Sequence, residues 1–368
     1  MNNNHQAIQD LRRAYRDGNL NLYLGAGVSI PSGLPTWEAL VQSLYFSVLI
    51  SEQYIYDFGP YPNYLYAASE WMLKRRNEPL DIVVRKISTW YQQKPEFFFD
   101  MIKKSLYSNF EELKKLYRGN SLADEIMESN KTLEMIVRLL KRSTGNGQGV
   151  REVISYNYDN LVEIGMKHQH AENKVQPIWK KGQRTTIGKI PVFHVHGFIP
   201  FEGLPSVEHD KVLFEEIIFS EEQYNSIFTD NQYWANQVQT QSLASGVGLM
   251  IGLSLSDRNM RRLLDSIREG PRATTNYVIL KKPSYAQLND TSAEIAEIKS
   301  KAREYSTRLA NSGIKAPDKE MRQIVQLMNL IFQYDESEFH KGYESLGLKI
   351  LLINDFEEIP EILDGIAS

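Results

Sequence analysis

The chain has 368 residues and no cysteine. This absence excludes disulfide bonds, thiolate metal sites and a cysteine nucleophile. No apolar run approaches the ~20 residues that span a bilayer, and the first fifteen residues, MNNNHQAIQDLRRAY, lack the apolar core of a signal peptide. We therefore expect a cytoplasmic protein that does not associate with membranes.

The sequence also lacks an excess of positive charge. It has 42 Lys and Arg against 46 Asp and Glu, a net charge of -4. Domains that bind nucleic acid are normally basic, so we expect no direct nucleic-acid binding. A hydrophobic content of 42% indicates a packed globular protein. The length allows one large α/β domain with insertions, or two domains.

The stretch Leu20–Trp37 has the most informative pattern. Leucines at every second position predict a short buried strand, which stops at Gly25-Ala26-Gly27. Trp37 then opens an amphipathic helix. A glycine turn between a strand and a helix lets the backbone approach a ligand closely, and the helix dipole there favours anions such as diphosphates. A lone Gly-Ala-Gly is equally consistent with a plain turn.

Strands and helices alternate along much of the chain. Further strands are predicted at Glu152–Tyr156, Lys189–Val195, Val247–Leu253, Asn276–Leu280 and Leu348–Ile353. Such alternation is typical of an α/β fold with a Rossmann-like, doubly wound parallel sheet. We assign residues 1–50 and 147–368 to this domain.

Residues 51–146 differ in character, because no clear strand pattern occurs there. Helical patterns occur near Leu80–Tyr91, Phe97–Leu106 and Leu122–Lys141. The simplest interpretation is a helical insertion or subdomain.

Short polar or glycine-containing segments follow several of the predicted strands. They are Gly25-Ala26-Gly27, Asn157-Tyr158-Asp159, His196-Gly197 and Gly252-Leu253-Ser254. In an open parallel sheet, ligands bind beyond the carboxyl ends of the strands, so these segments are expected to converge on one crevice. An ordinary dinucleotide fingerprint is excluded because Ile30 replaces its third glycine, and no P-loop is present.

In order and position these segments resemble the sirtuin family. The matching pieces are Gly25-Ala26-Gly27-Val28-Ser29, Gly33-Leu34-Pro35, Tyr156-Asn157-Tyr158-Asp159, His196-Gly197, Gly252-Leu253-Ser254 and Ile353-Asn354. The resemblance extends over nearly the whole chain, with long unmatched stretches between the pieces. It implies a sirtuin-like fold and NAD as the ligand.

Three departures narrow this resemblance. The four cysteines of the sirtuin zinc ribbon are missing, Thr36 stands where aspartate is usual, and Tyr156 replaces a glutamine. In these respects the chain is similar to the bacterial sirtuin-like NAD hydrolases of anti-phage defence, including the Thoeris effector and those paired with short Argonautes or translocase ATPases. That similarity implies NAD+ as a substrate, no zinc, a homo-oligomer, and an ATPase or Argonaute as a candidate partner.

The resemblance also assigns the site residues. It makes Asn157 and His196 catalytic, and it assigns NAD binding to Gly25, Ala26, Gly27, Ser29, Asp159, Gly252, Ser254 and Asn354, with no metal ligand. The expected reaction releases nicotinamide and ADP-ribose through an oxocarbenium-like transition state. The amide of Asn157 can hold a water or a ribose hydroxyl, and His196 suits general-base catalysis near neutral pH.

Several alternatives remain at this stage. Asn157 and Asp159 could simply cap the helix that follows them. His194 and His196 are spaced to face the same side of a strand, so they could form a metal pair, although no third ligand is evident, or one could be a buried, hydrogen-bonded histidine. At the level of function, the alternatives are a sensor that binds NAD or ADP-ribose without turnover, and a protein deacylase.

Overall fold

A computed structural model describes most of the chain. The described parts are residues 2–51, 62–76, 78–91, 94–108, 110, 122–144, 147–201, 216–230, 232–268, 274–283 and 324–368, with a few single residues between 296 and 307.

The described part of the chain is built on a seven-stranded sheet with the order β3-β4-β2-β1-β5-β6-β7. All six pairs of neighbouring strands are parallel. The strands are β1 (Leu20–Leu24), β2 (Val150–Ser155), β3 (Val175–Ile178), β4 (Ile190–His194), β5 (Val247–Ile251), β6 (Asn276–Lys281) and β7 (Leu348–Ile353). The predicted Rossmann-like, doubly wound α/β fold is confirmed. The switch in strand order lies at β1, which pairs with β2 on one side and β5 on the other.

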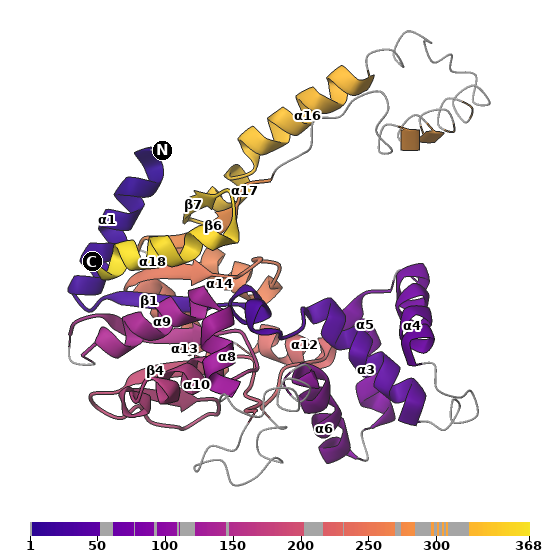
Figure 1. The fold of residues 1–368 in the computed structure, drawn as a ribbon, viewed down its shortest axis with the longest axis horizontal. Coiled ribbons are helices and arrows are strands. Elements are labelled where there is room, and N and C mark those ends of the chain that lie inside the picture. Colours follow the sequence, from indigo (N-terminus) through magenta and orange to yellow (C-terminus); the bar gives the residue numbers. More distant parts are fainter. Residues whose placement is uncertain are drawn as a thin grey trace.

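Helices cover both faces of this sheet (Figure 1). Apolar side chains of α1 (Asn2–Arg16), α9 (Lys131–Arg142), α10 (Leu161–His168) and α18 (Ile359–Ala367) pack in the core on one face. Those of α13 (Trp234–Ala244) and α14 (Arg258–Arg268) pack on the other. Successive residues of β1 point to opposite faces, so Leu22 belongs to the first core and Tyr23 to the second. Because both faces are covered, β1 is buried along its whole length.

A group of helices lies beside the sheet domain (Figure 1). It consists of α3 (Trp37–Ser51), α4 (Pro62–Arg76), α5 (Leu80–Trp90) and α6 (Pro95–Leu106), and α3 contacts each of the other three. We call these four elements the lateral helices. They connect back to the sheet domain through α12 (Glu221–Thr229), which contacts α5.

One predicted helix is in fact two. The pattern at Leu122–Lys141 predicts a single element, but α8 (Leu122–Ser129) ends before α9 begins. Asn130 causes the break: its side chain accepts a hydrogen bond from the amide of Leu133, 3.0 Å away, and so caps α9. The same side chain donates to the carbonyl of Val28 at 2.6 Å. It therefore fixes α9 against the segment that follows β1.

The remaining described elements are short or peripheral. They are α2 (Ala26–Ser29), η1 (Ile30–Ser32), η3 (Glu172–Lys174), α16 (Ile324–Glu338), α17 (Lys341–Glu344) and η5 (Phe356–Glu358). No helix in the described residues is long and apolar enough to cross a membrane.

Candidate functional site

The glycine turn after β1 packs directly against the turn after β5. The amide of Gly27 donates to the carbonyl of Gly252 at 3.0 Å, and Gly252 has a positive φ of 66°. A Cβ on Gly25 would lie 2.5 Å from the Gly252 oxygen, and one on Gly27 would lie 2.7 Å from the Gly252 Cα. Two of the predicted binding segments therefore meet at the switch in strand order, and the glycines are required for that contact. Ala26 and Gly27 are exposed there.

Asn157 reaches across from the end of β2 to this glycine turn. Its Nδ2 donates to the carbonyl oxygen of Gly25 at 3.0 Å and to Oγ of Ser29 at 2.9 Å. These two donations fix the orientation of the carboxamide. Its Oδ1 accepts no hydrogen bond from the described residues, and the side chain is partly exposed. The amide is therefore held at one end and presents an acceptor at the other.

Asp159 fixes the position of the Ser29 side chain through a buried hydrogen bond. The Ser29 hydroxyl donates to Oδ2 of Asp159 at 2.7 Å, and Oδ1 accepts the amide of Leu161 at 3.1 Å. Burial raises the pKa of the Asp159 carboxyl, against the lowering effect of these two donors. The helix-cap alternative thus holds in part for Asp159, whose carboxylate accepts the first amide of α10, although the N-cap residue itself is Asn160. It does not hold for Asn157, whose side chain is turned to Gly25 and Ser29.

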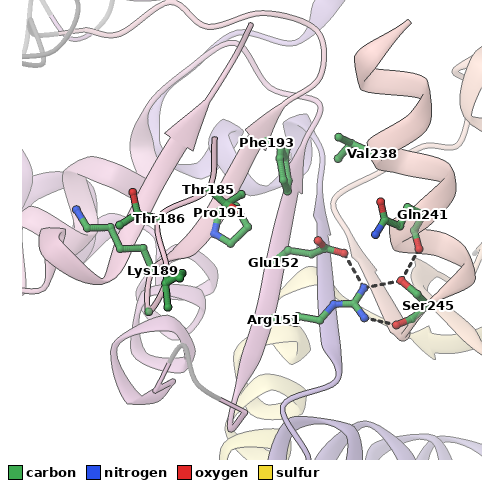
Figure 2. A pocket seen from close by; sticks show the side chains of 12 residues that line it. Arg151, Glu152, Thr185, Thr186, Lys189, Pro191, Phe193, Val238, Gln241 and Ser245 are labelled. Atoms are coloured by element: carbon green, nitrogen blue, oxygen red, sulfur yellow. Dashed lines mark hydrogen bonds and ion pairs between the residues drawn. The ribbon is translucent and has the colours of Figure 1, made fainter. Parts of the chain in front are cut away.

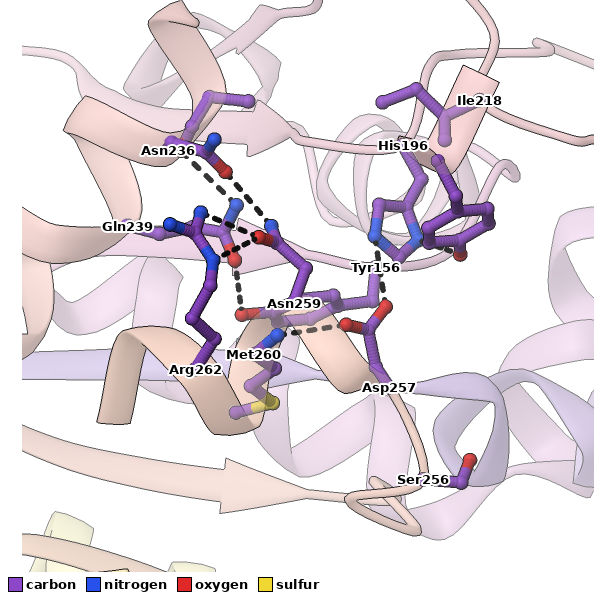
Figure 3. Close-up of polar contacts among 12 residues, drawn as sticks. Tyr156, His196, Ile218, Asn236, Gln239, Ser256, Asp257, Asn259, Met260 and Arg262 are labelled. Atoms are coloured by element: carbon purple, nitrogen blue, oxygen red, sulfur yellow. Dashed lines mark hydrogen bonds and ion pairs between the residues drawn. The ribbon is translucent and has the colours of Figure 1, made fainter. Parts of the chain in front are cut away.

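His196 lies at the centre of a second polar group, drawn in Figure 3. Its Nε2 is 3.3 Å from a carboxylate oxygen of Asp257, and its Nδ1 is 3.4 Å from the hydroxyl of Tyr224. The ring of Tyr156 meets the imidazole edge-on, with 5.2 Å between ring centroids. The imidazole is buried, with 8% of the residue exposed. Asp257 and Tyr224 were not predicted from the sequence.

The charge of Asp257 is stabilised where it lies. Burial acts to raise its pKa, but the hydrogen bond and charge of His196 and the amides of Met260 and Asn259 hold the pKa below its usual value. Oδ1 of Asp257 accepts the Met260 amide at 2.8 Å, so this residue also caps α14. The position of Asp257 just before a helix, at the carboxyl end of β5, is the sequence signal that could have marked it.

Asn157 and His196 come from neighbouring strands in equivalent positions. Ser155 of β2 pairs with His194 of β4, and each site residue lies two positions beyond that pair. Neighbouring strands are about 5 Å apart. The side chains turn different ways, Asn157 toward the turn after β1 and His196 toward the turn after β5. The turn after β1 contacts Gly252, the first residue after β5, whereas Asp257 lies five residues further along the chain. In the described residues no side-chain contact joins Asn157 to His196 or Asp257.

The prediction that His194 and His196 share a face is wrong. β4 ends at His194, and the chain then turns at Gly197, whose φ is 103°. His194 is buried on the α10 side, where its Nε2 lies 3.1 Å from Glu163, whereas His196 faces Asp257. The alternation of a strand no longer applies once the strand has ended. The described residues hold no group of three or more His, Asp or Glu that could bind a metal.

Two predicted NAD-binding residues, Ser254 and Asn354, have other hydrogen-bond partners than the Asn157 group. Ser254 is exposed, and its hydroxyl is 2.7 Å from that of Ser256. Asn354 follows β7, three strands from β1 and thus about 14 Å along the sheet. It is exposed, and its amide donates to Glu358 at 2.8 Å. Both residues remain on the carboxyl edge of the sheet, but no contact joins them to Asn157 or His196 in the described structure.

A groove of about 680 Å³ lies near the amino-terminal ends of the strands, opposite to the ends that carry the candidate site (Figure 2). Its lining includes Arg151 from the start of β2 and Pro191 from the start of β4. The Arg151 guanidinium bonds to Glu152 at 2.8 Å and to Oγ of Ser245 at 2.9 Å. This groove is separate from the residues discussed above, which all follow the carboxyl ends of the strands.

The fold and site define a class: a doubly wound α/β protein with polar side chains gathered at the carboxyl ends of its central strands. Comparison with family models adds that residues 151–309 match the SIR2-like domain. This range is less than half of the chain and contains Asn157, His196 and Asp257, whereas β1 and its glycine turn lie outside it. The match supports a sirtuin-like family and an NAD-dependent activity in general. No curated protein matches the chain.

Proposed function

We propose that the chain hydrolyses NAD+ to nicotinamide and ADP-ribose. The observation that carries this proposal is the fixed carboxamide of Asn157, whose Oδ1 is directed away from its two anchors on Gly25 and Ser29. An acceptor held in this way, after the strand that neighbours the one preceding His196, suits the activation of a water or the binding of a ribose hydroxyl.

The reaction needs little acid catalysis. The bond between C1′ of the ribose and the pyridinium nitrogen breaks, and its electron pair leaves on nicotinamide, which becomes neutral. Positive charge develops on the ribose, as in glycoside hydrolysis. A water oxygen then bonds to C1′ and loses a proton. The protein must therefore orient the ribose, exclude other nucleophiles and accept that proton.

His196 and Asp257 fit the role of proton acceptor and its partner. If Nε2 carries the hydrogen that faces Asp257, then Nδ1 is the basic nitrogen. The hydroxyl of Tyr224 lies 3.4 Å from Nδ1, and burial raises the pKa of that hydroxyl well above its usual value. Tyr224 thus stays protonated at neutral pH and can give way to water or to a ribose hydroxyl. Asp257 stabilises the imidazolium once the proton has moved.

We further propose that this activity depletes cellular NAD+ as an anti-phage defence effector in the cytoplasm. The support is the resemblance to that branch of sirtuin-like proteins and the absence of cysteine for a zinc ribbon. An enzyme that destroys NAD+ must be controlled. Assembly into a homo-oligomer, or with an ATPase or an Argonaute, would supply that control, and the lateral helices offer surface for it.

An assay with and without an acetylated peptide separates this proposal from its alternatives. The full chain is incubated with NAD+, and nicotinamide and ADP-ribose are measured. We expect both products without peptide. NAD+ binding without product would identify a sensor, and product only in the presence of peptide would identify a deacylase. Either result would overturn the proposal.

A further inference from the structure

The segment Ile217–Ser220 is packed directly against the turn that carries His196. All four of its residues are buried. The amide of Ile218 donates to the carbonyl of His196 at 2.9 Å, and Figure 3 shows the two residues side by side. A Cβ on Gly197 would lie 2.7 Å from the Cα of Ile217, so the glycine after His196 is what allows this close approach. We call Ile217–Ser220 the brace.

Tyr158 holds the brace from the other side. Its hydroxyl donates to the carbonyl of Ile218 at 2.7 Å. The two polar groups of Ile218 thus connect Tyr158 to His196 through a single residue. Burial, together with the charge of Asp257, raises the pKa of the Tyr158 hydroxyl, which therefore remains a donor at neutral pH. Tyr158 stands between Asn157 and Asp159, so the segment that presents Asn157 also fixes the backbone of His196.

Phe219 anchors the brace among the lateral helices. Its ring lies edge-on to Trp37 of α3, with 4.9 Å between centroids, and edge-on to Phe98 of α6 at 6.3 Å. A third neighbour is the ring of Tyr158, at 5.6 Å. Phe219 is 1% exposed. Aromatic rings prefer offset-stacked or edge-to-face arrangements, so these contacts restrict the orientation of the Phe219 ring.

The far end of the brace returns to the imidazole. Ser220 accepts the amide of Tyr224 at 3.0 Å in the first turn of α12, and Tyr224 faces Nδ1 of His196. The amides of Phe219 and Ser220 both donate to Oε1 of Gln223 at 2.8 Å. The brace therefore bonds to the backbone of His196 through Ile218. Through Ser220 it also holds Tyr224, whose hydroxyl faces the His196 ring.

We propose that Tyr158 is a positioning residue for NAD+ hydrolysis, acting through the brace to set His196 relative to Asn157. This inference depends on the proposed function. Because Phe219 belongs to the brace, its packing against α3 and α6 also helps to position the imidazole of His196. The lateral helices thereby influence the site without contributing a residue to it.

The test compares Tyr158→Phe with Tyr15→Phe. Both substitutions delete a hydroxyl that donates to a backbone carbonyl, since the hydroxyl of Tyr15 donates to Leu139 at 3.0 Å. Tyr15 lies on α1, in the core on the α9 side of the sheet. Two quantities are measured on the full chain: the kinetics of NAD+ hydrolysis, and the imidazole proton–carbon NMR signal of His196 without NAD+. The loss of one signal in His196→Gln identifies it among the seven histidines.

We expect Tyr158→Phe to lower kcat by about 10-fold with little change in KM, because a small misplacement of a catalytic group is costly. Its His196 signal should shift, while Tyr15→Phe leaves both quantities unchanged. An unshifted signal, or a shifted signal with normal kcat, would overturn the positioning role. If wild type does not hydrolyse NAD+ but the signal shifts, the proposed function fails and the structural connection stands.

Phe219→Leu tests the anchor and retains an apolar side chain. We expect a shift of the His196 signal and a lower kcat in the same direction as for Tyr158→Phe. Wild-type values of both quantities in this variant would show that contact with the lateral helices does not influence His196.

Discussion

Nε2 of His196 lies 3.3 Å from a carboxylate oxygen of Asp257, and this contact connects the loop after β4 to the loop after β5. The strands themselves are not neighbours, because β2 and β1 lie between them. A buried carboxylate beside one ring nitrogen selects which nitrogen carries hydrogen and which remains basic. The orientation of the proposed base thus depends on a residue 61 positions later in the chain.

Asp257→Asn should reduce NAD+ hydrolysis while leaving the fold intact. The amide has the same shape and can still cap α14, but it loses the charge that stabilises a protonated imidazole. General acid–base catalysis contributes about 100- to 10,000-fold, so a loss of roughly 10- to 100-fold is expected when the base is misoriented. Asp265→Asn, at an exposed position of the same helix, is the control. Equal activity of the two variants would remove Asp257 from the site.

The same substitution should lower stability near neutral pH and have a smaller effect at acid pH. The pKa of Asp257 is lowered in the folded protein, so its ionised form stabilises the fold. That stability is fully present above the ordinary value of 3.8 and is lost as the pH falls through the lowered value. We expect the difference in Tm between wild type and Asp257→Asn to shrink below about pH 4. A difference that stays constant down to pH 2 would contradict this assignment.

Asp159 should have the opposite pH dependence. Burial raises its pKa, so the folded protein holds its proton more tightly than the unfolded chain does. Stability contributed by this group is therefore greatest below 3.8 and falls as the pH rises through the raised value. Asp159→Asn keeps an acceptor for Ser29 and removes the charge. Its Tm relative to wild type, measured by thermal melts, should increase as the pH rises above about 4. A Tm difference between the two proteins that does not depend on pH would contradict the raised pKa of Asp159.

Gly252→Ala should destabilise the fold strongly. The residue has a φ of 66°, and a Cβ there would lie 2.6 Å from the amide nitrogen of Val28. Backbone strain and overpacking together should cost about 2 kcal/mol or more. Gly182→Ala isolates the strain alone, because φ is 82° and nothing lies within 4 Å. In denaturant unfolding, the free energy of unfolding of Gly252→Ala should be well below that of Gly182→Ala. Equal free energies of unfolding would refute the tight contact between the two turns.

Much of the fold could be predicted from the sequence, because the central strands are covered on both faces and are therefore strongly apolar. The continuous apolar runs of β5 and β6 and the alternation in β1 leave few alternatives. β3 was missed because it has only four residues and contains Pro177, which disfavours a strand except at an edge. It lies at the edge of the sheet. The break at Asn130 was missed because its partners Val28 and Ser32 lie about 100 residues away in the chain.

Only part of the candidate site could be predicted from the sequence. Glycines and polar residues after strands indicate the carboxyl edge, and the family resemblance singled out Asn157 and His196. The position of Asp257 just before a helix marks it as a candidate, but the contacts of Asp257 and Tyr224 with the imidazole could not be predicted, because they depend on how two loops and α12 pack. For the same reason, the glycines of the first turn could not be recognised as packing against Gly252.

The most direct test of the account compares NAD+ turnover by wild type and Asn157→Ala, with NAD+ binding measured on both. We predict equal amounts of nicotinamide and ADP-ribose from wild type, and at least about a 100-fold loss in the variant with binding retained. Wild-type turnover by Asn157→Ala would contradict the account.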